Sequence, residues 1–312
     1  WCWGNQGSYR LGNGSNANVV LTTPVKAKTN NLPAGKRIHS MSGTYATTCV
    51  IAAEKLYCWG NNYNGQTDVT SGGANVGQPT LVPGMAAKKV TAAASGHWNT
   101  CAVSEGELWC GGDNRFGVNA NGTATGTQAF TKGGGALAKK NVTAVELAND
   151  NGCAVADNSL YCWGSGNYGQ LTSASGTSYV PVKIPGLPKG EIRDISIGYA
   201  HICAVVDTSL WCWGKNLEGE VGNGTTAKVA KPYRVKGALQ GKSVESVDAG
   251  HEFTCAIASG EAYCWGANAF GQTGTGTAAA TTVPVKVPSG AGQAPAVISA
   301  GRYSSVLATV QR

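Results

Sequence analysis

Residues 162–171 read Cys-Trp-Gly-Ser-Gly-Asn-Tyr-Gly-Gln-Leu, and the opening tripeptide recurs along the whole chain. Cys-Trp-Gly begins at Cys2, Cys58, Cys162, Cys212 and Cys264. A sixth copy, Cys110-Gly111-Gly112, has glycine in place of tryptophan. Successive cysteines are 56, 52, 52, 50 and 52 residues apart, and the step from Cys264 through the termini to Cys2 is 50, which accounts for all 312 residues. The sequence therefore predicts a single domain over residues 1–312, built from six repeats of about 52 residues.

Each repeat contains four short segments with the pattern of β-strands. In the second repeat, residues 90–95, 100–104 and 107–110 are apolar runs separated by turn residues. A fourth, more polar strand is clearest later in the chain, at residues 179–184 and 283–287. Four strands in about 50 residues is typical of one β-propeller blade. We therefore expect an all-β, closed propeller of six four-stranded blades, or seven if sequence is missing upstream.

The two ends of the chain carry complementary parts of a repeat. The chain opens at a third strand, residues 1–4, and closes just after a second strand, residues 304–310. Pairing of these strands would assemble the last blade from both termini and remove the exposed sheet edges. Because the chain opens on Trp1 in the middle of the pattern, we also expect that an upstream segment, such as a leader, an anchor or a partner domain, precedes it.

Three motifs resemble a known repeat family. Residues 163–171 (Trp-Gly-Ser-Gly-Asn-Tyr-Gly-Gln-Leu), 181–185 (Pro-Val-Lys-Ile-Pro) and 249–251 (Ala-Gly-His) are similar to the regulator of chromosome condensation repeat, and the match recurs across essentially the whole chain. The resemblance implies a propeller, usually of seven blades, so six repeats depart from it. The chain is identified as a secreted, disulfide-rich member of bacterial type.

The composition excludes several classes of protein. Apolar residues make up 42% of the chain, charged residues only 13%, and there are 45 glycines, which suits short strands and tight turns. The sequence contains no run of 18 apolar residues, the length that a membrane-spanning helix needs. The net charge of +7 gathers partly at Lys36-Arg37, Lys88-Lys89 and Lys139-Lys140, each shortly before a strand. Such a basic ring could attract nucleic acid, but a solvated rim that blocks edge pairing explains it better, so we expect no nucleic-acid partner.

Ten of the eleven cysteines form pairs nine residues apart, and each pair flanks a two-residue turn. The pairs are Cys49/Cys58, Cys101/Cys110, Cys153/Cys162, Cys203/Cys212 and Cys255/Cys264. Counting outward from a two-residue hairpin loop places each pair at a non-hydrogen-bonded position, where Cα atoms lie about 4.5 Å apart and a disulfide can form. Cys2 has no cysteine opposite it, because the equivalent residue of the last repeat is Val306. We predict five disulfides and one free thiol.

Five disulfides require an oxidising compartment, so the sequence predicts an extracellular protein, secreted or displayed at the cell surface. Two cysteines per repeat and only four histidines in the chain do not make metal sites, and we expect no metal or cofactor. The best-known activity of the family that the chain resembles is nucleotide exchange on a nuclear GTPase. An oxidising compartment argues against that activity for this chain.

The sequence contains no clear catalytic motif. It has no nucleophile elbow, and the glycine-rich residues 271–276 lack the lysine and the helix of a phosphate loop. A pair of carboxylates far apart in sequence could still serve a glycosidase. His97 and His251 follow glycines at equivalent repeat positions, which indicates a structural role. We therefore expect a protein without enzymatic activity.

Two sets of aromatic residues are candidates for ligand binding. The first follows the glycine that ends each first strand, and comprises Tyr45, Trp98, Tyr199, Phe253 and Tyr303. The second lies in the loop after the tryptophan, is expected at the opposite end of the blades, and comprises Phe116, Tyr168 and Phe270. Exposed aromatics on the loops of a rigid scaffold are common anchors of protein interfaces, whereas buried ones would fill gaps between blades. The tryptophans of the Cys-Trp-Gly motif are assigned to packing between blades.

The sequence thus favours a non-catalytic adhesion or protein-recognition domain, with a protein or a cell-surface ligand as its partner. A secreted enzyme inhibitor and a lectin-like, carbohydrate-binding propeller are the alternatives. A lectin would repeat the same polar and aromatic residues in every blade, and here the aromatic residue varies between blades.

Overall fold

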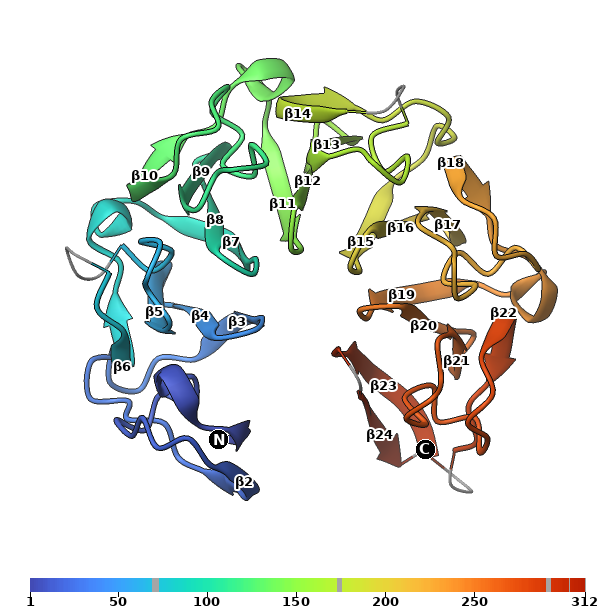
Figure 1. Cartoon of the computed structure of the whole chain (residues 1–312), viewed down its shortest axis with the longest axis horizontal. Helices are drawn as coiled ribbons and strands as arrows, with labels where there is room; N and C mark the ends of the chain where they lie inside the picture. The colour runs from blue at the N-terminus through green and yellow to red at the C-terminus, as the bar shows by residue number, and fades with distance from the viewer. Residues whose placement is uncertain (69–72, 173–175, 290–292, 303, 312) are drawn as a thin grey trace. The chain divides into compact units, whose positions relative to one another are not determined.

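The structure is a computed structural model that describes residues 1–68, 73–172, 176–289, 293–302 and 304–311. It divides into two compact units. Unit 1 comprises residues 1–157, 161–164 and 177–182, and unit 2 comprises residues 158–160, 165–176 and 183–312. The strand labels used below are those of Figure 1.

Unit 1 contains three four-stranded antiparallel sheets, which we call blades 1 to 3, and a two-stranded sheet at the N-terminus. The N-terminal sheet consists of β1 (Cys2–Asn5) and β2 (Val20–Val25). Blade 1 consists of β3 (Ile38–Gly43), β4 (Thr47–Ala52), β5 (Lys55–Gly60) and β6 (Val76–Leu81). Blade 2 consists of β7 (Val90–Ser95), β8 (Asn99–Ser104), β9 (Glu107–Gly112) and β10 (Thr127–Lys132). Blade 3, which lies mostly in unit 1, consists of β11 (Val142–Leu147), β12 (Asn151–Ala156), β13 (Ser159–Ser165) and β14 (Thr177–Lys183).

Unit 2 contains two further four-stranded blades and a two-stranded sheet at the C-terminus. Blade 4 consists of β15 (Ile192–Ile197), β16 (His201–Val206), β17 (Ser209–Gly214) and β18 (Val229–Arg234). Blade 5 consists of β19 (Val244–Ala249), β20 (Phe253–Ala258), β21 (Glu261–Gly266) and β22 (Thr281–Lys286). The C-terminal sheet consists of β23 (Gln293–Ala300) and β24 (Ser305–Gln311). Single 3₁₀ turns interrupt the loops at Gly7–Tyr9, Pro83–Met85, Gly135–Leu137 and Gly237–Leu239.

The all-β prediction is confirmed, and so is the order of four strands in the five repeats that form blades 1 to 5. The predicted pairing of the N-terminal strand with residues 304–310 would join one unit to the other, and it stays a prediction, as does the single domain over residues 1–312.

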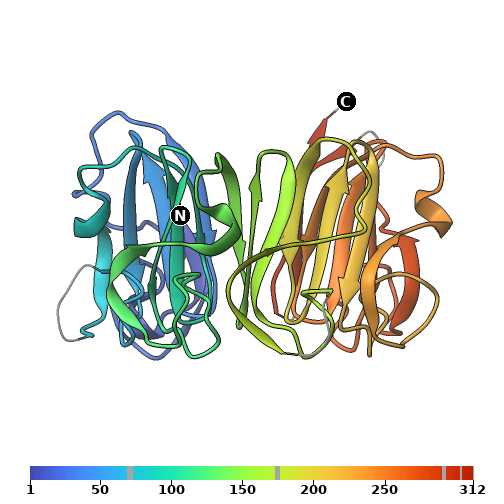
Figure 2. The same ribbon diagram turned by 90° about the horizontal axis from the view of Figure 1, so that it is seen from above.

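Each blade has two distinct ends because its strands run up and down in sequence order (Figure 2). The second and third strands are joined by a two-residue turn, and we call that end of the blade the hairpin end. The turn Ala53-Glu54 has φ of 50° and 59°, and the turn Asp157-Asn158 has φ of 45° and 52°. Positive φ at both residues is the type I′ geometry that matches the twist of a two-residue hairpin. The loops between strands one and two and between strands three and four meet at the opposite end, which we call the loop end.

The five predicted cysteine pairs are disulfide-bonded. Cys101 and Cys110 face each other directly in the register of β8 and β9, and the Cα–Cα distances of the five bridges are 4.1 to 4.2 Å. Cys2 is a free, half-buried cysteine.

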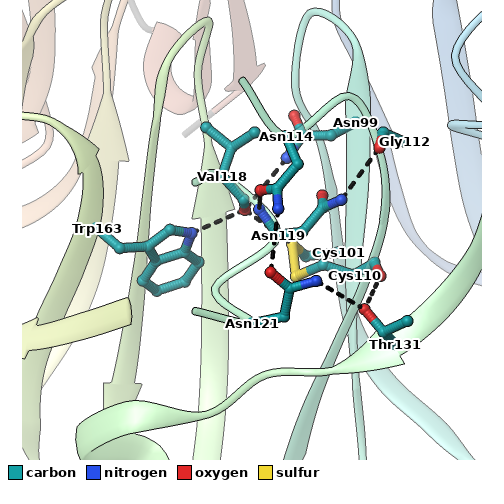
Figure 3. The surroundings of a disulfide bond; sticks show 10 residues. All are labelled: Asn99, Cys101, Cys110, Gly112, Asn114, Val118, Asn119, Asn121, Thr131 and Trp163. Carbon is teal, nitrogen blue, oxygen red and sulfur yellow. Dashed lines mark hydrogen bonds between the residues drawn. A yellow bond between two sulfur atoms is a disulfide. The ribbon is translucent and has the colours of Figure 1, made fainter. Parts of the chain in front are cut away.

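The motif tryptophans pack between blades, as predicted. Trp163 is fully buried, lies in one cluster with the disulfide Cys101–Cys110 of the preceding blade, and donates its indole N–H to the Val118 carbonyl at 2.8 Å (Figure 3). Trp265 packs on the disulfide Cys203–Cys212 in the same manner. Trp3 differs, because it is 58% exposed on the N-terminal two-stranded sheet.

The motif glycine has its own structural reason. Gly164 has a φ of +96°, and a Cβ added there would lie 2.1 Å from the Asp150 carbonyl oxygen. Gly60 has a φ of +103°, and its Cβ would lie equally close to the Ala46 carbonyl. Only glycine allows the third strand to turn so close to the loop between the first two strands.

Blade 2 replaces the missing tryptophan with a phenylalanine from another strand. A Cβ at Gly111 would lie 3.2 Å from the ring of Phe130, and Phe130 packs on the disulfide Cys49–Cys58 of blade 1. The other blades have proline at the position of Phe130, at Pro79, Pro181, Pro232 and Pro284. The space between blades is therefore filled in both cases, by different strands.

Candidate functional site

Backbone hydrogen bonds fix which loop residues are equivalent between blades. The amide of Gly96 donates to the Asn99 carbonyl, and Thr44, Ala148, Gly198 and Gly250 each make the same bond to the residue three positions later. The residues directly after these positions are therefore equivalent, and they are Tyr45, His97, Asn149, Tyr199 and His251. Trp98 lies one place further along. Tyr303, the fifth candidate of this set, lies outside the described residues.

Phe253 does not belong to this exposed set, and the prediction of its exposure is wrong. It is the first residue of β20, faces Gly266 across the hairpin, and is fully buried. The equivalent residues are Thr47, Asn99, Asn151 and His201, all of which are buried too. The prediction failed because it counted aromatics after a glycine without fixing the register of the second strand.

The second aromatic set lies at the same end of the blades as the first, and its predicted placement at the opposite end is wrong. In an antiparallel sheet of four strands in sequence order, the first and third connections fall at one end. The amide of Asp113, in the loop with Phe116, donates to the Trp98 carbonyl at 2.9 Å. The amides of Asn61, Lys215 and Ala267 make equivalent bonds to the first loop of their own blades. Within each unit, the members of the two predicted sets therefore share the loop end of their blades.

Unit 1 gathers a stack of aromatic rings at its loop end. The Tyr45 and His97 rings are 4.4 Å apart, and His97 stacks on Trp98 at 4.3 Å with an angle of 11° between the planes. The guanidinium of Arg10 lies 5.6 Å from the centre of the Tyr45 ring. Tyr45 is 54% exposed, whereas His97, Trp98 and Arg10 are half-buried. Contacts between the rings hold the stack in place while about half of the Tyr45 side chain remains exposed to solvent.

A charged group lies in the adjoining loops of unit 1. Arg115 forms an ion pair with Asp113 at 2.6 Å, and the hydrogen bond between them raises the pKa of Arg115. Burial raises the pKa of the half-buried Asp150, while the positive charge of Arg115 opposes that change. Arg115 thus pairs with Asp113 and acts on Asp150 through its charge, and the exposed Phe116 follows it in the sequence.

Unit 2 carries a related group built around a buried ion pair. The Tyr199 and His251 rings are 4.5 Å apart, and the amide of Tyr199 donates to the His251 carbonyl. Lys215, almost fully buried, pairs with the buried Glu220 at 3.1 Å and with the partly exposed Glu252 at 2.7 Å. Burial lowers the pKa of Lys215, but the hydrogen bond to Glu252 and the charge of Glu220 together raise it above its usual value.

His201 serves the packing beneath this group. Burial lowers its pKa to about 3, so the ring is neutral. The Thr254 hydroxyl donates to the Glu220 carbonyl, so it is the Nε2–H of His201 that donates to the Thr254 oxygen at 2.9 Å. This histidine is a structural residue.

The remaining candidates differ in exposure. Phe270 is 71% exposed, and Tyr168 is half-buried. Sequence reasoning missed Tyr63 and Leu217, which are also well exposed and stand one position before the Phe116 and Phe270 place in their loops. Both residues stand five positions after the cysteine of the Cys-Trp-Gly motif, so a count from that cysteine over two adjacent loop positions would have found them.

The lysines before the first strands behave as a rim at the hairpin end. Lys88 lies 3.6 Å from the centre of the Trp109 ring, and Lys89 lies 3.8 Å from a carboxylate oxygen of Glu54. Lys140 pairs with Asp157 at 2.9 Å. Neighbouring acids and rings thus engage these charges, which agrees with the interpretation as a solvated rim.

The described residues include neither a candidate metal site nor a candidate membrane span. No group of three or more histidine, cysteine, aspartate or glutamate side chains there could hold a metal ion. Among the same residues, no helix is long and apolar enough to cross a membrane.

Comparison with known proteins defines the class as a propeller of RCC1 repeats. The regulator of chromosome condensation (RCC1) repeat matches residues 54–103, 157–205, 207–257 and 259–308, more than half of the chain. The structure of yeast Prp20p, from Saccharomyces cerevisiae, superposes with a TM-score of 0.85 at 20% identity, covering 99% of this chain and 78% of Prp20p. The chain therefore belongs to the RCC1 repeat family and has its β-propeller fold.

Two curated relatives are similar along most of the sequence. The human E3 ubiquitin-protein ligase HERC2 is 27% identical over 307 residues, which is 95% of this chain and 6% of HERC2. The ultraviolet-B receptor UVR8 of Arabidopsis thaliana is 28% identical over 292 residues, which is 88% of this chain and 62% of UVR8. The chain thus spans less than two thirds of each relative.

Proposed function

We propose that this chain is an extracellular or cell-surface recognition domain that binds a protein partner through the loop end of its blades and performs no catalysis. The observation that carries the proposal is the stack of Arg10, Tyr45, His97 and Trp98, which is held by ring contacts and still presents Tyr45 to solvent. Aromatic and arginine side chains fixed on a rigid scaffold are the residues that contribute most to protein interfaces.

Two further observations support the proposal. Prp20p, which shares the fold, has binding properties to Gsp1p and histones, so this propeller architecture accommodates protein partners. The five disulfides support the extracellular location, because such bonds persist in oxidising compartments. A secreted enzyme inhibitor would use the same surface. A lectin is less well supported, since the equivalent loop residue is not the same in every blade: it is tyrosine at Tyr45 and Tyr199, histidine at His97 and His251, and asparagine at Asn149.

The binding experiment uses Y45A and W98A, with V283A as the matched control and F253A as the folding control. Val283 is 43% exposed on the outer strand β22 and belongs to neither candidate aromatic set. Labelled protein is bound to intact target cells before and after the cell surface is treated with protease. We expect protease to abolish binding, and Y45A and W98A to weaken it about 30-fold, which corresponds to about 2 kcal/mol, at unchanged melting temperature.

Three results would contradict the proposed function. The first is protease-resistant binding, which would indicate a glycan or lipid ligand. The second is a fall in melting temperature for W98A as large as that for F253A, which would assign Trp98 to packing. The third is labelling of all eleven cysteines by an alkylating reagent added before lysis of the producing cells, since an extracellular protein should offer only Cys2.

A further inference from the structure

The hairpin end of blade 4 contains a cavity that the proposed recognition surface does not involve. Its volume is about 340 Å³, and it lies between the turn after β16 and the segment that leads from β18 to β19. Hydrophobic side chains, among them Leu210 and Leu239, form part of its lining. The polar part of the lining comprises Thr208, Ser209, Arg234, Lys236, Gln240 and Lys242.

The charge of this cavity is positive and only partly balanced. Lys242 pairs with Glu261 at 2.9 Å, which offsets its charge. Arg234 and Lys236 have no ion-pair partner among the described residues. One guanidinium nitrogen of Arg234 donates to the Ser209 hydroxyl at 3.0 Å, which directs the side chain along the cavity wall. The guanidinium has five donors, so this bond leaves others for a ligand.

Blade 2 contains the equivalent cavity, which carries carboxylates as well as cations. That cavity has a volume of about 310 Å³ and is lined by Glu107, Leu108, Leu137 and Lys132 at the places of Ser209, Leu210, Leu239 and Arg234. Glu107 forms an ion pair with Lys132, which takes the place of Arg234, and Lys140 pairs with Asp157. Lys139 also lines this cavity, at the place of Gly241 in blade 4. At the place of Arg234, the exchange of serine for glutamate decides whether the cation is available to a ligand.

We propose that the cavity of blade 4 binds the carboxylate of a small, sugar-sized ligand such as a sugar acid. A planar guanidinium pairs with a carboxylate through two parallel hydrogen bonds, and Lys236 adds charge at the same rim. The hydroxyls of Thr208 and Ser209 and the amide of Gln240 provide polar partners for ligand hydroxyls. The site lies at the hairpin end, so it is independent of the protein-binding surface proposed at the loop end.

The test is isothermal titration calorimetry with glucuronate as the probe and glucose as its neutral counterpart, at constant ionic strength. We expect one glucuronate per chain at millimolar affinity and no saturable binding of glucose. S209E should weaken glucuronate binding at least tenfold, because the new carboxylate would pair with Arg234 as Glu107 pairs with Lys132. E107S should raise the stoichiometry toward two by opening the cavity of blade 2. R234M provides a second loss-of-binding variant should S209E fold poorly, which the melting temperature reports.

Several outcomes would overturn the inference. Equal binding of glucose and glucuronate would remove the role of the carboxylate. Wild-type affinity in both S209E and R234M would place the binding elsewhere on a cationic surface. Binding of sulfate without binding of glucuronate would show that the site recognises a bare oxyanion and not a sugar acid.

Discussion

The substitution Val306→Cys tests whether the two ends of the chain complete one blade. Val306 pairs with Ser299 in the C-terminal sheet, as Cys255 pairs with Asp248 in blade 5. Cys2 opens a Cys-Trp-Gly motif, as Cys264 does. If the N-terminal strands complete the C-terminal sheet, Cys2 faces residue 306. The Cα–Cα distance between them should then equal the 4.1 to 4.2 Å of the five existing pairs. V306C should then form a sixth disulfide with Cys2.

The size of the expected stabilisation follows from the loop that the new bond closes. A ten-residue loop, as in the existing bridges, is worth about 2.7 kcal/mol in the chain-entropy model. A bond between residues 2 and 306 closes a loop of about 305 residues and is worth about 5 to 6 kcal/mol in the same model. With an unfolding entropy of about 2.1 cal/mol/K per residue, this corresponds to a rise in melting temperature of about 8 °C.

The assay is thiol counting by alkylation without reduction, followed by peptide mapping. The wild type should show one reactive thiol, and V306C should show none, with a cross-linked peptide that contains Cys2. S305C is the matched control, because successive residues of a strand point to opposite faces and its new thiol should remain free. A V306C protein that stays monomeric with two reactive thiols, or that forms a dimer that reductant dissolves, would refute the closure.

Three further predictions concern packing and charge. K215M should destabilise the fold by about 3–5 kcal/mol, because it leaves the buried Glu220 without its cation. The double variant K215N/E220Q copies the hydrogen-bonded pair Asn61–Gln66 of blade 1 and should recover most of this stability in chemical denaturation. An equal loss of stability in both variants would contradict the reasoning. Burial raises the pKa of Asp194 to about 6, above its value of 3.8 in the unfolded chain, so its ionisation should cost up to about 3 kcal/mol of stability as the pH rises from 4 to 7. D194N keeps an oxygen that accepts from the Val247 amide and should lose this pH dependence. An unchanged slope of stability against pH in D194N would exclude Asp194 as its source. F130A should cost about 3–5 kcal/mol of stability through the cavity that it leaves between blades 1 and 2. G111W should recover stability only when it is combined with F130P, as thermal melts of F130A, F130P, G111W and G111W/F130P would show. Additive effects of G111W and F130P would argue against a shared site.

The sequence alone was sufficient where local geometry decides the outcome. The nine-residue spacing around a two-residue turn determines the cross-strand pairing, so the disulfides followed from counting. The spacing of the Cys-Trp-Gly copies determined the repeat and hence the fold. Both signals are short in range and are repeated, so an error at one copy would have been corrected by the others.

The candidate site was harder to predict because it depends on register at single loops. Phe253 was assigned to the surface, yet one residue of difference in the loop makes it the first buried residue of β20. The exchange of Trp for Phe130 in blade 2 is invisible without the structure, since the two positions lie on different strands and are 19 residues apart in sequence. The pairing of Lys215 with Glu252 joins two blades and has no sequence signal either.

The repeats separate the residues that hold the fold from those that can define its specificity. The packing between neighbouring blades keeps the same chemistry: a disulfide lies against the next blade's tryptophan, or against Phe130 where the tryptophan is absent. Positions on the two ends of the blades change freely, as in the series Tyr45, His97, Asn149, Tyr199 and His251 and in the exchange of Ser209 for Glu107. A ligand that required one identical site per blade would constrain these positions to be alike. Their variation instead favours a partner that spans several different loops at one end and a ligand that occupies a single blade at the other.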